Sequence, residues 1–203
     1  MKHNSEELWN QLNAQVFQLY QQGQFNQAVT LAEQALKLAQ SVYQGDHPNI
    51  ALSLNNLAEL YRSQGKLSEV EPLHQQALAM RQQLFDGDHP DIAQSLNNLA
   101  FLYQSQGKLS QAEPLYQQAL AMTQRLFQGD HPDVAQSLNN LAYLYDSQGK
   151  LSQAEPLFQQ ALAMRQRLFQ GDHPDLAQSL NNLAALYKSQ GKLSQAEPLY
   201  QQA

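Results

Sequence analysis

Residues 88–129 read DHPDIAQSLNNLAFLYQSQGKLSQAEPLYQQALAMTQRLFQG, and the chain repeats this stretch several times. The next 42 residues, 130–171, differ from it at only five positions. These pairs are Ile92/Val134, Phe101/Tyr143, Gln104/Asp146, Tyr116/Phe158 and Thr123/Arg165. The same pattern begins earlier at Asp46, begins again at Asp172 and stops unfinished at Ala203. A fixed period of this size is typical of a stacked repeat array.

The composition excludes several classes of protein. The 203 residues carry a net charge of −6 and no segment concentrates Lys or Arg, which argues against nucleic acid and anionic membranes as partners. There is no cysteine, so disulfides, thiolate metal ligands and a catalytic thiol are excluded. Residues 1–7 lack the apolar core of a signal peptide, and no apolar run approaches membrane-spanning length. We therefore expect a soluble, cytoplasmic protein.

Each repeat divides into two helices. In the repeat that starts at Ala93, the apolar residues of the first helix have helical spacing: Ile92, Leu96, Leu99, Ala100 and Tyr103. Asp88-His89-Pro90 opens this helix with a cap followed by a proline, whose missing N–H would be unpaired in any case. Gly107 follows the helix, in a position that favours a left-handed backbone.

The second helix of the repeat is expected to start at Ser110. The stretch from Ser110 to Glu113 has the pattern of a capping box, and Pro114 fits only near the start of a helix. The apolar stripe of this helix contains Ala112, Leu115, Tyr116, Ala119 and Leu120. His74 stands at the position of Tyr116 one repeat earlier, and we interpret it as a packing residue. Two helices joined by a short turn and repeated predict an all-α solenoid.

We expect a single solenoid over residues 9–203. Residues 1–8 form a polar lead-in, with Ser5 as the N-cap of the first helix. The repeats are assigned to residues 9–50, 51–92, 93–134, 135–176 and 177–203, of which the last is incomplete. The first repeat keeps Gly23 at the repeat spacing but lacks the pair of Asn residues discussed below, as expected of a terminal cap. The natural chain is expected to continue beyond Ala203.

The repeat resembles the tetratricopeptide repeat. The residues that carry the likeness are Leu96, Leu99, Ala100, Tyr103, Gly107, Ala112, Tyr116 and Ala119. The 42-residue period is similar to that of kinesin-light-chain repeats, with their phrase HPD-A-S-LNNLA-LY-QGK-AEPLY-AL, and the likeness recurs four times over nearly the whole chain. The resemblance implies a right-handed superhelical solenoid whose first helices line a concave groove. It also implies that a peptide or partner protein binds in that groove.

Two departures limit what the resemblance implies. The heptad coiled coil of a kinesin light chain is missing, so attachment to a motor is not implied. Chaperone-type repeats hold a C-terminal carboxylate with a basic clamp, and the matching positions here hold uncharged residues. These are Leu52, Asn55, Gln94, Asn97 and Asn98.

Neither catalysis nor metal binding is expected. Nearly every polar group recurs one repeat apart, whereas an active site needs a unique set of convergent groups. The Asp-His pairs at 46–47, 88–89, 130–131 and 172–173 invite comparison with zinc ligands. Zinc needs about four ligands within about 2.3 Å, while packed helices place equivalent positions roughly 10 Å apart. We interpret these pairs as helix caps and loop anchors, and we predict no catalytic residue, metal or cofactor.

Pairs of Asn residues stand in the middle of the first helix from the second repeat onward. Asn costs about 0.5 kcal/mol relative to Ala inside a helix, so these residues need a reason. One alternative is a hydrogen-bond ladder that joins adjacent repeats. The other is that the amides bind the backbone of an extended peptide, as the resemblance implies. For this role we name the first residue of each pair: Asn55, Asn97, Asn139 and Asn181.

Only two positions differ in all four repeats from Ala51 onward. One holds Glu59, Phe101, Tyr143 and Ala185, and the other holds Arg62, Gln104, Asp146 and Lys188. Because they are three residues apart, they share one helix face, which the resemblance places on the concave side. Exposed aromatic side chains usually have a function, so we expect selection of peptide side chains here. The expected residues are Glu59, Arg62, Phe101, Gln104, Tyr143, Asp146 and Lys188, and drift on a solvated face is the alternative.

The sequence thus predicts a non-enzymatic scaffold that binds a protein or peptide partner. The alternative is a structural spacer, or a rod that self-assembles by end-to-end stacking. The apolar residues of the last helix would mediate such stacking: Leu193, Ala196, Leu199 and Tyr200.

Overall fold

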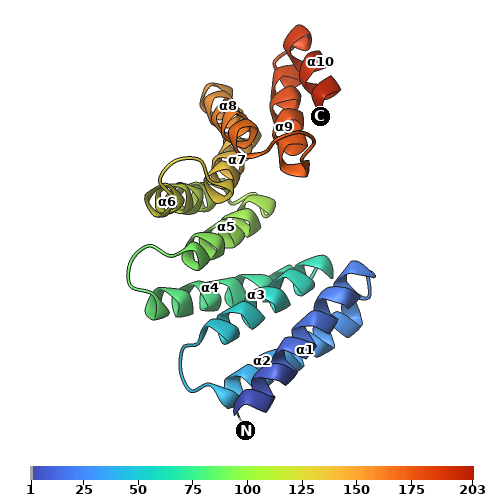
Figure 1. Ribbon diagram of the computed structural model, residues 1–203, viewed down its shortest axis with the longest axis vertical. Coiled ribbons are helices and arrows are strands. Elements are labelled where there is room, and N and C mark those ends of the chain that lie inside the picture. The colour runs from blue at the N-terminus through green and yellow to red at the C-terminus, as the bar shows by residue number, and fades with distance from the viewer. Residues whose placement is uncertain (1) are drawn as a thin grey trace. The chain divides into compact units, whose positions relative to one another are not determined.

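A computed structural model describes residues 2–203, which form ten helices and no strand (Figure 1). The helices are α1 (Lys2–Gln21), α2 (Phe25–Val42), α3 (Pro48–Ser63), α4 (Leu67–Leu84), α5 (Pro90–Ser105), α6 (Leu109–Leu126), α7 (Pro132–Ser147), α8 (Leu151–Leu168), α9 (Pro174–Ser189) and α10 (Leu193–Gln202). From α3 onward, each helix pair begins 42 residues after the previous one. The prediction of an all-α array of helix-turn-helix repeats is confirmed.

A histidine caps the first helix of each repeat from α3 onward. Its Nδ1 accepts a hydrogen bond from the N–H two residues further on, at 3.2 Å for His47, His131 and His173 and at 3.1 Å for His89. A proline follows, where no N–H is needed. Each imidazole also stacks on a ring from the end of the preceding helix, as Phe85 does on His89 with centroids 3.5 Å apart. The expected cap and loop anchor is confirmed, and the capping group is the imidazole.

A glycine turn joins the two helices of a repeat. After α7, Gly149 has a φ of 71°, and its N–H donates to the carbonyl of Asp146 at 2.9 Å. The N–H of Lys150 donates to the carbonyl of Tyr145 at 2.8 Å, which completes a Schellman motif. The Lys150 ammonium lies 5.3 Å from the centre of the Tyr145 ring. The same contact recurs in the other repeats, between Lys66 and Tyr61, Lys108 and Tyr103, and Lys192 and Tyr187.

The predicted capping box at Ser110 is wrong. α6 begins at Leu109 after Lys108, and no side chain caps it. Because the glycine turn already fixes Lys108 as the residue before the helix, Ser110 falls inside the first turn. Glu113 instead accepts hydrogen bonds from the next repeat, from Lys150 Nζ at 3.0 Å and Gln148 Nε2 at 3.2 Å.

The predicted N-cap at Ser5 is also wrong, because α1 begins at Lys2 and already contains Ser5. No proline or glycine stands between Lys2 and Trp9, so nothing ends the helix there. Trp9 is buried, and its Nε1 donates to Ser53 Oγ of α3 at 2.9 Å, which holds α1 in place. Residues 2–8 are therefore helical, and Met1 lies outside the described residues.

The chain forms two compact units, one ending at Leu102 and the other starting at Tyr103. The core of the first unit contains Trp9, Val16, Ala28, Leu54 and Leu57 in two clusters. The core of the second unit includes Val134, Leu138 and Ala161. Many of the buried residues are alanines, and such small side chains allow the two helices of a repeat to pack closely.

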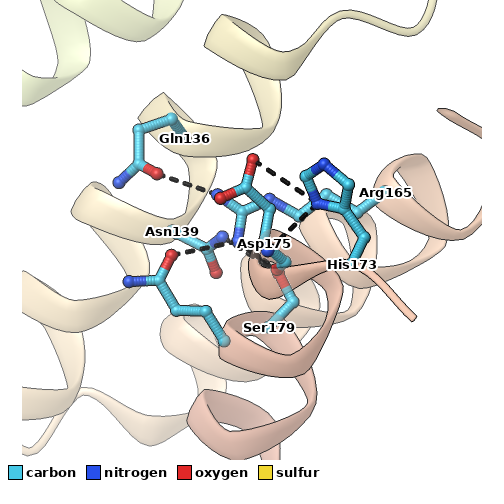
Figure 2. Close-up of polar contacts among 7 residues, drawn as sticks. Gln136, Asn139, Arg165, His173, Asp175 and Ser179 are labelled. Atoms are coloured by element: carbon cyan, nitrogen blue, oxygen red, sulfur yellow. Dashed lines mark hydrogen bonds and ion pairs between the residues drawn. The ribbon is translucent and has the colours of Figure 1, made fainter. Parts of the chain in front are cut away.

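A buried arginine joins the second helix of one repeat to the first helix of the next, as Figure 2 shows for Arg165. From α8, its Nη1 donates to the carbonyl of Asp175 at 2.7 Å and to Ser179 Oγ at 2.9 Å, both in α9. Its Nη2 donates to Gln136 Oε1 of α7 at 2.8 Å. Burial lowers the pKa of the Arg165 guanidinium. Hydrogen bonds of this kind are what allow a charged group to be buried.

The junction between α6 and α7 lacks this arginine. In the first unit, Arg81 repeats the arrangement, with bonds of 2.8 Å to the carbonyl of Asp91 and to Ser95 Oγ. The equivalent residue in α6 is Thr123, whose hydroxyl donates to the carbonyl of Leu120 at 3.0 Å within its own helix. Ser137 Oγ in α7 is buried and has no hydrogen-bond partner. This position, at which Thr123 differs from Arg165, was noted in the sequence, but nothing there indicated a junction.

Candidate functional site

The two variable positions of the first helices form one solvent-accessible face in each unit, which we call the variable face. Phe101 is 46% exposed and Tyr143 is 58% exposed, although both are large apolar side chains. Ala185 and Lys188 are exposed, whereas Glu59, Arg62, Gln104 and Asp146 are half-buried. The predicted exposure of the two aromatic side chains, Phe101 and Tyr143, is therefore confirmed, while the role of the variable face in binding stays a prediction.

The variable face extends into the first repeat, which the sequence analysis did not include. Phe17 and Tyr20 of α1 precede Glu59 and Arg62 by 42 residues and are 63% and 40% exposed. The sequence could have identified Phe17 and Tyr20, because they lie one 42-residue period before Glu59 and Arg62. Asn13 likewise corresponds to Asn55, so the first repeat keeps one residue of the Asn pair.

In the first unit, charged and aromatic side chains lie together on the variable face. Arg62 Nε donates to Glu59 Oε2 at 2.8 Å. The Arg62 guanidinium carbon is 5.4 Å from the centre of the Phe101 ring, a cation–π contact between α3 and α5. A pocket of about 280 Å³ between α1 and α3 is lined by Phe17, Tyr20 and Glu59, among others.

His74 in α4 supports Glu59 from beneath the variable face. It is only 1% exposed, as expected of a packing residue, but its ring is part of a polar network. Its Nδ1 lies 3.0 Å from Asn55 Oδ1, and its Nε2 lies 3.6 Å from Glu59 Oε1. Burial raises the pKa of the Glu59 carboxyl, but His74 and Arg62 lower it more, so that this pKa falls below its ordinary value. Glu59 is therefore ionised at neutral pH.

In the second unit, the residues equivalent to His74 are Tyr116 and Phe158, and they differ in the hydrogen bonds that they can make to the variable face. Tyr116 donates its hydroxyl to Gln104 Oε1 at 3.1 Å, and burial raises the pKa of this phenol. Phe158 has no polar atom, and burial raises the pKa of the Asp146 carboxyl in that repeat. Each repeat thus presents a different combination of charge and hydrogen-bonding groups on the same position of its first helix.

The four Asn residues named for peptide binding lie in different surroundings. Asn55 is buried next to His74, and Asn139 is buried and donates to Ser179 Oγ in the next repeat at 3.1 Å. The bond from Asn139 is of the kind expected from a ladder between repeats. Asn97 is half-buried, and Asn181 is exposed.

Among the side chains that the structure describes, those of residues 4–203, no cluster of three or more His, Asp or Glu could hold a metal ion. None of the described helices has the length and apolar character needed to cross a membrane. The exposed aromatic side chains of the variable face remain the main feature that packing does not explain.

The sequence matches the family model of the tetratricopeptide repeat over residues 8–83, 71–125, 91–167 and 153–203. A comparison with curated proteins found no relative.

Solved structures with kinesin-light-chain-type repeats are similar to this chain. One is a kinesin-light-chain-like protein of Podosopora anserina with nearly identical TPR-like repeats, which is 27% identical over 100% of this chain and 95% of that chain, with a TM-score of 0.81. Another is BtubC (BKLC) from P. vanneervenii, 30% identical over 97% of this chain and 78% of that chain, with a TM-score of 0.83. A Rap protein in complex with competence and sporulation factor shares the fold at 20% identity, with a TM-score of 0.74 over 92% of this chain and 50% of that chain.

The family model covers almost the entire sequence, and the helix pairs recur with its period. The chain belongs to the tetratricopeptide repeat family, and its repeats are similar to those of kinesin-light-chain-like proteins.

Proposed function

We propose that this chain is a non-enzymatic scaffold that binds a peptide or an extended segment of a partner protein along its variable face. The observation that carries the proposal is the exposure of Phe17, Phe101 and Tyr143 at equivalent positions of α1, α5 and α7. Large aromatic side chains are enriched among the residues that dominate binding energy at protein interfaces. The exposed Gln pairs of the second helices offer a contrast, because they do not change between repeats: Gln75-Gln76, Gln117-Gln118 and Gln159-Gln160.

The proposed binding residues follow from their positions. Glu59, Arg62, Phe101, Gln104, Tyr143, Asp146 and Lys188 would select side chains, together with Phe17 and Tyr20. Asn97 and Asn181 would offer amides to a peptide backbone. Asn55 and Asn139 are buried, so the same role requires that a ligand reach Asn55 Nδ2 and Asn139 Oδ1, the buried amide atoms for which no partner is found among the described residues. The Rap protein that shares this fold was solved in complex with competence and sporulation factor, and the fold likeness alone supports no particular partner for this chain.

Peptide display tests the proposal. A random library is panned on the wild-type chain and on a variant with Phe17, Phe101 and Tyr143 changed to Ala. A matched control changes the exposed second-helix residues Gln76, Gln118 and Gln160 to Ala. We expect peptides that share a motif, bind wild type and control alike, and lose binding to the aromatic variant. If no peptide prefers the wild type to the aromatic variant, the chain is better regarded as a spacer.

A further inference from the structure

The pocket between α1 and α3 is lined by apolar, aromatic and acidic side chains. Val16 and Leu60 contribute apolar surface, and the rings of Phe17 and Tyr20 stand beside them. Glu59 and Asn56 are among its polar residues, and no Lys or Arg lines it.

The orientation of the two amides in the pocket is fixed by a chain of hydrogen bonds. Asn13 Nδ2 donates to the carbonyl of Trp9 at 2.7 Å, and a carbonyl can only accept. Asn13 therefore presents its Oδ1 to α3, where it accepts from Asn56 Nδ2 at 3.1 Å. This leaves Asn56 Oδ1 as an acceptor for which no donor is found in the described part of the chain.

The carboxylate of Glu59 also keeps an acceptor for a ligand. Arg62 engages Oε2 through Nε and Nη2, each at 2.8 Å. Oε1 lies 3.6 Å from His74 Nε2, which is longer than a hydrogen bond. Asn56 Oδ1 thus lacks a donor, Glu59 Oε1 has only His74 Nε2 at 3.6 Å, and both atoms belong to residues that line the same pocket.

The pocket consequently favours a cation on an apolar stem. A Lys or Arg side chain can lie along apolar surface with its methylene groups while its charged end seeks acceptors. Ring faces attract such a cation within about 6 Å. A carboxylate ligand would be repelled by Glu59, and an apolar side chain would leave both acceptors unpaired. Arg62 provides an internal precedent, because its guanidinium already pairs with Glu59 and lies over Phe101.

We propose that this pocket binds a Lys or Arg side chain of the peptide partner. This inference rests on the proposed function and specifies one side chain by which the peptide would be held. Arg62 is a like charge near the pocket, so it weakens the attraction between Glu59 and the ligand cation. Replacing Arg62 by Gln should therefore strengthen, and replacing Glu59 by Gln should weaken, the preference for a basic side chain.

The test uses the full chain and a bead library of acetylated, amidated octapeptides. One position carries Lys, Arg, norleucine or Glu, and the others are random. We measure the enrichment of Lys and Arg over norleucine, which has a similar stem without charge. We expect roughly tenfold enrichment on the wild type, the effect of one charge-assisted hydrogen bond. Enrichment should decrease on Glu59→Gln and increase on Arg62→Gln. It should stay the same on the control Glu69→Gln, because Glu69 is an exposed carboxylate of α4 that does not line the pocket.

Each result decides the proposal. The increase on Arg62→Gln is a gain that a misfolded variant could not give. Equal enrichment of norleucine and Lys on the wild type would overturn the basic anchor while leaving peptide binding intact. Enrichment of Glu that Arg62→Gln removes would overturn it in favour of an acidic anchor. If no peptide binds the wild type at all, the proposed function fails and this inference fails with it.

Discussion

A histidine caps the first helices where serine, threonine, asparagine or aspartate is the usual choice. At His89 the imidazole has two tasks, because Nδ1 accepts from the N–H of Asp91 while the ring stacks on Phe85. The stack fixes the ring, and the fixed ring holds its acceptor over the helix end. This explains how the Asp-His-Pro motif serves as a structural anchor.

Removal of one cap should have a measurable cost. We expect His89→Ala to reduce the free energy of unfolding by about 1 kcal/mol, since one helix N–H loses its acceptor. His89→Asn should recover part of this, because its side-chain oxygen can cap the helix but cannot stack as the imidazole does. Urea unfolding followed by circular dichroism measures the change, with the exposed Gln94→Ala in the same helix as control. A midpoint for His89→Ala equal to that of the wild type would contradict the capping role.

At the scale of helices, a buried arginine joins α4 to α5 and α8 to α9, whereas Thr123 stands at the equivalent position of α6. We expect Arg165→Thr, which reproduces the residue found at position 123, to cost about 2 kcal/mol because charged hydrogen bonds to α9 are lost. Chemical unfolding measures this, and Arg167→Thr is the matched control. Arg167 forms an exposed ion pair with Asp130, and such pairs contribute little. Equal effects of the two substitutions would refute a special role for the buried arginine.

The ion pairs between neighbouring repeats should make stability depend on pH. Hydrogen bonds from Lys150 and Lys192 lower the pKa values of Glu113 and Glu155 below the ordinary value of 4.5. A lowered carboxyl pKa adds stability above the unfolded pKa, and this is lost as the pH falls through the folded pKa.

A double variant, Glu113→Gln with Glu155→Gln, should therefore be less stable than the wild type at pH 7. The difference should shrink as the pH falls below 4.5. Thermal unfolding over a pH series provides the measurement. Glu197→Gln is the control, because Glu197 occupies the position in α10 equivalent to that of Glu113 and Glu155, and no ion pair from it is found among the described residues. A difference between double variant and wild type that is the same at pH 3 and pH 7 would rule out this linkage.

The sequence predicted the helix pairs because period, glycine and proline are local signals that recur unchanged. It failed at Ser110, where the capping-box pattern was present but the preceding turn had already fixed the helix start. It also could not find the function of Arg165, since the acceptors of a buried guanidinium come from the following repeat. The variable face was found by comparing repeats, and only its first-repeat members, Phe17 and Tyr20, were missed.

For the molecule as a whole, self-association is the alternative to ligand binding. Leu193 and Tyr200 of α10 are exposed apolar residues through which one chain could stack on another. We expect light scattering to give the mass of a single chain at every concentration, because the scaffold we propose needs no second copy. A mass that increases with concentration, and that Leu193→Glu returns to that of one chain, would favour the self-assembling rod.

The turn between the two helices of a repeat restricts the chain lengths that are compatible with this fold. Lys108 closes α5 through its N–H, rests on Tyr103 and directly precedes α6, and the N–H of Gly107 donates to the carbonyl of Gln104, so both residues have fixed contacts in the turn between the two helices. The histidine caps do the same at the other connection. An insertion of a single residue would shift a glycine, a lysine or a histidine out of its place. Lengthening or shortening such a protein is therefore a matter of adding or deleting whole 42-residue modules.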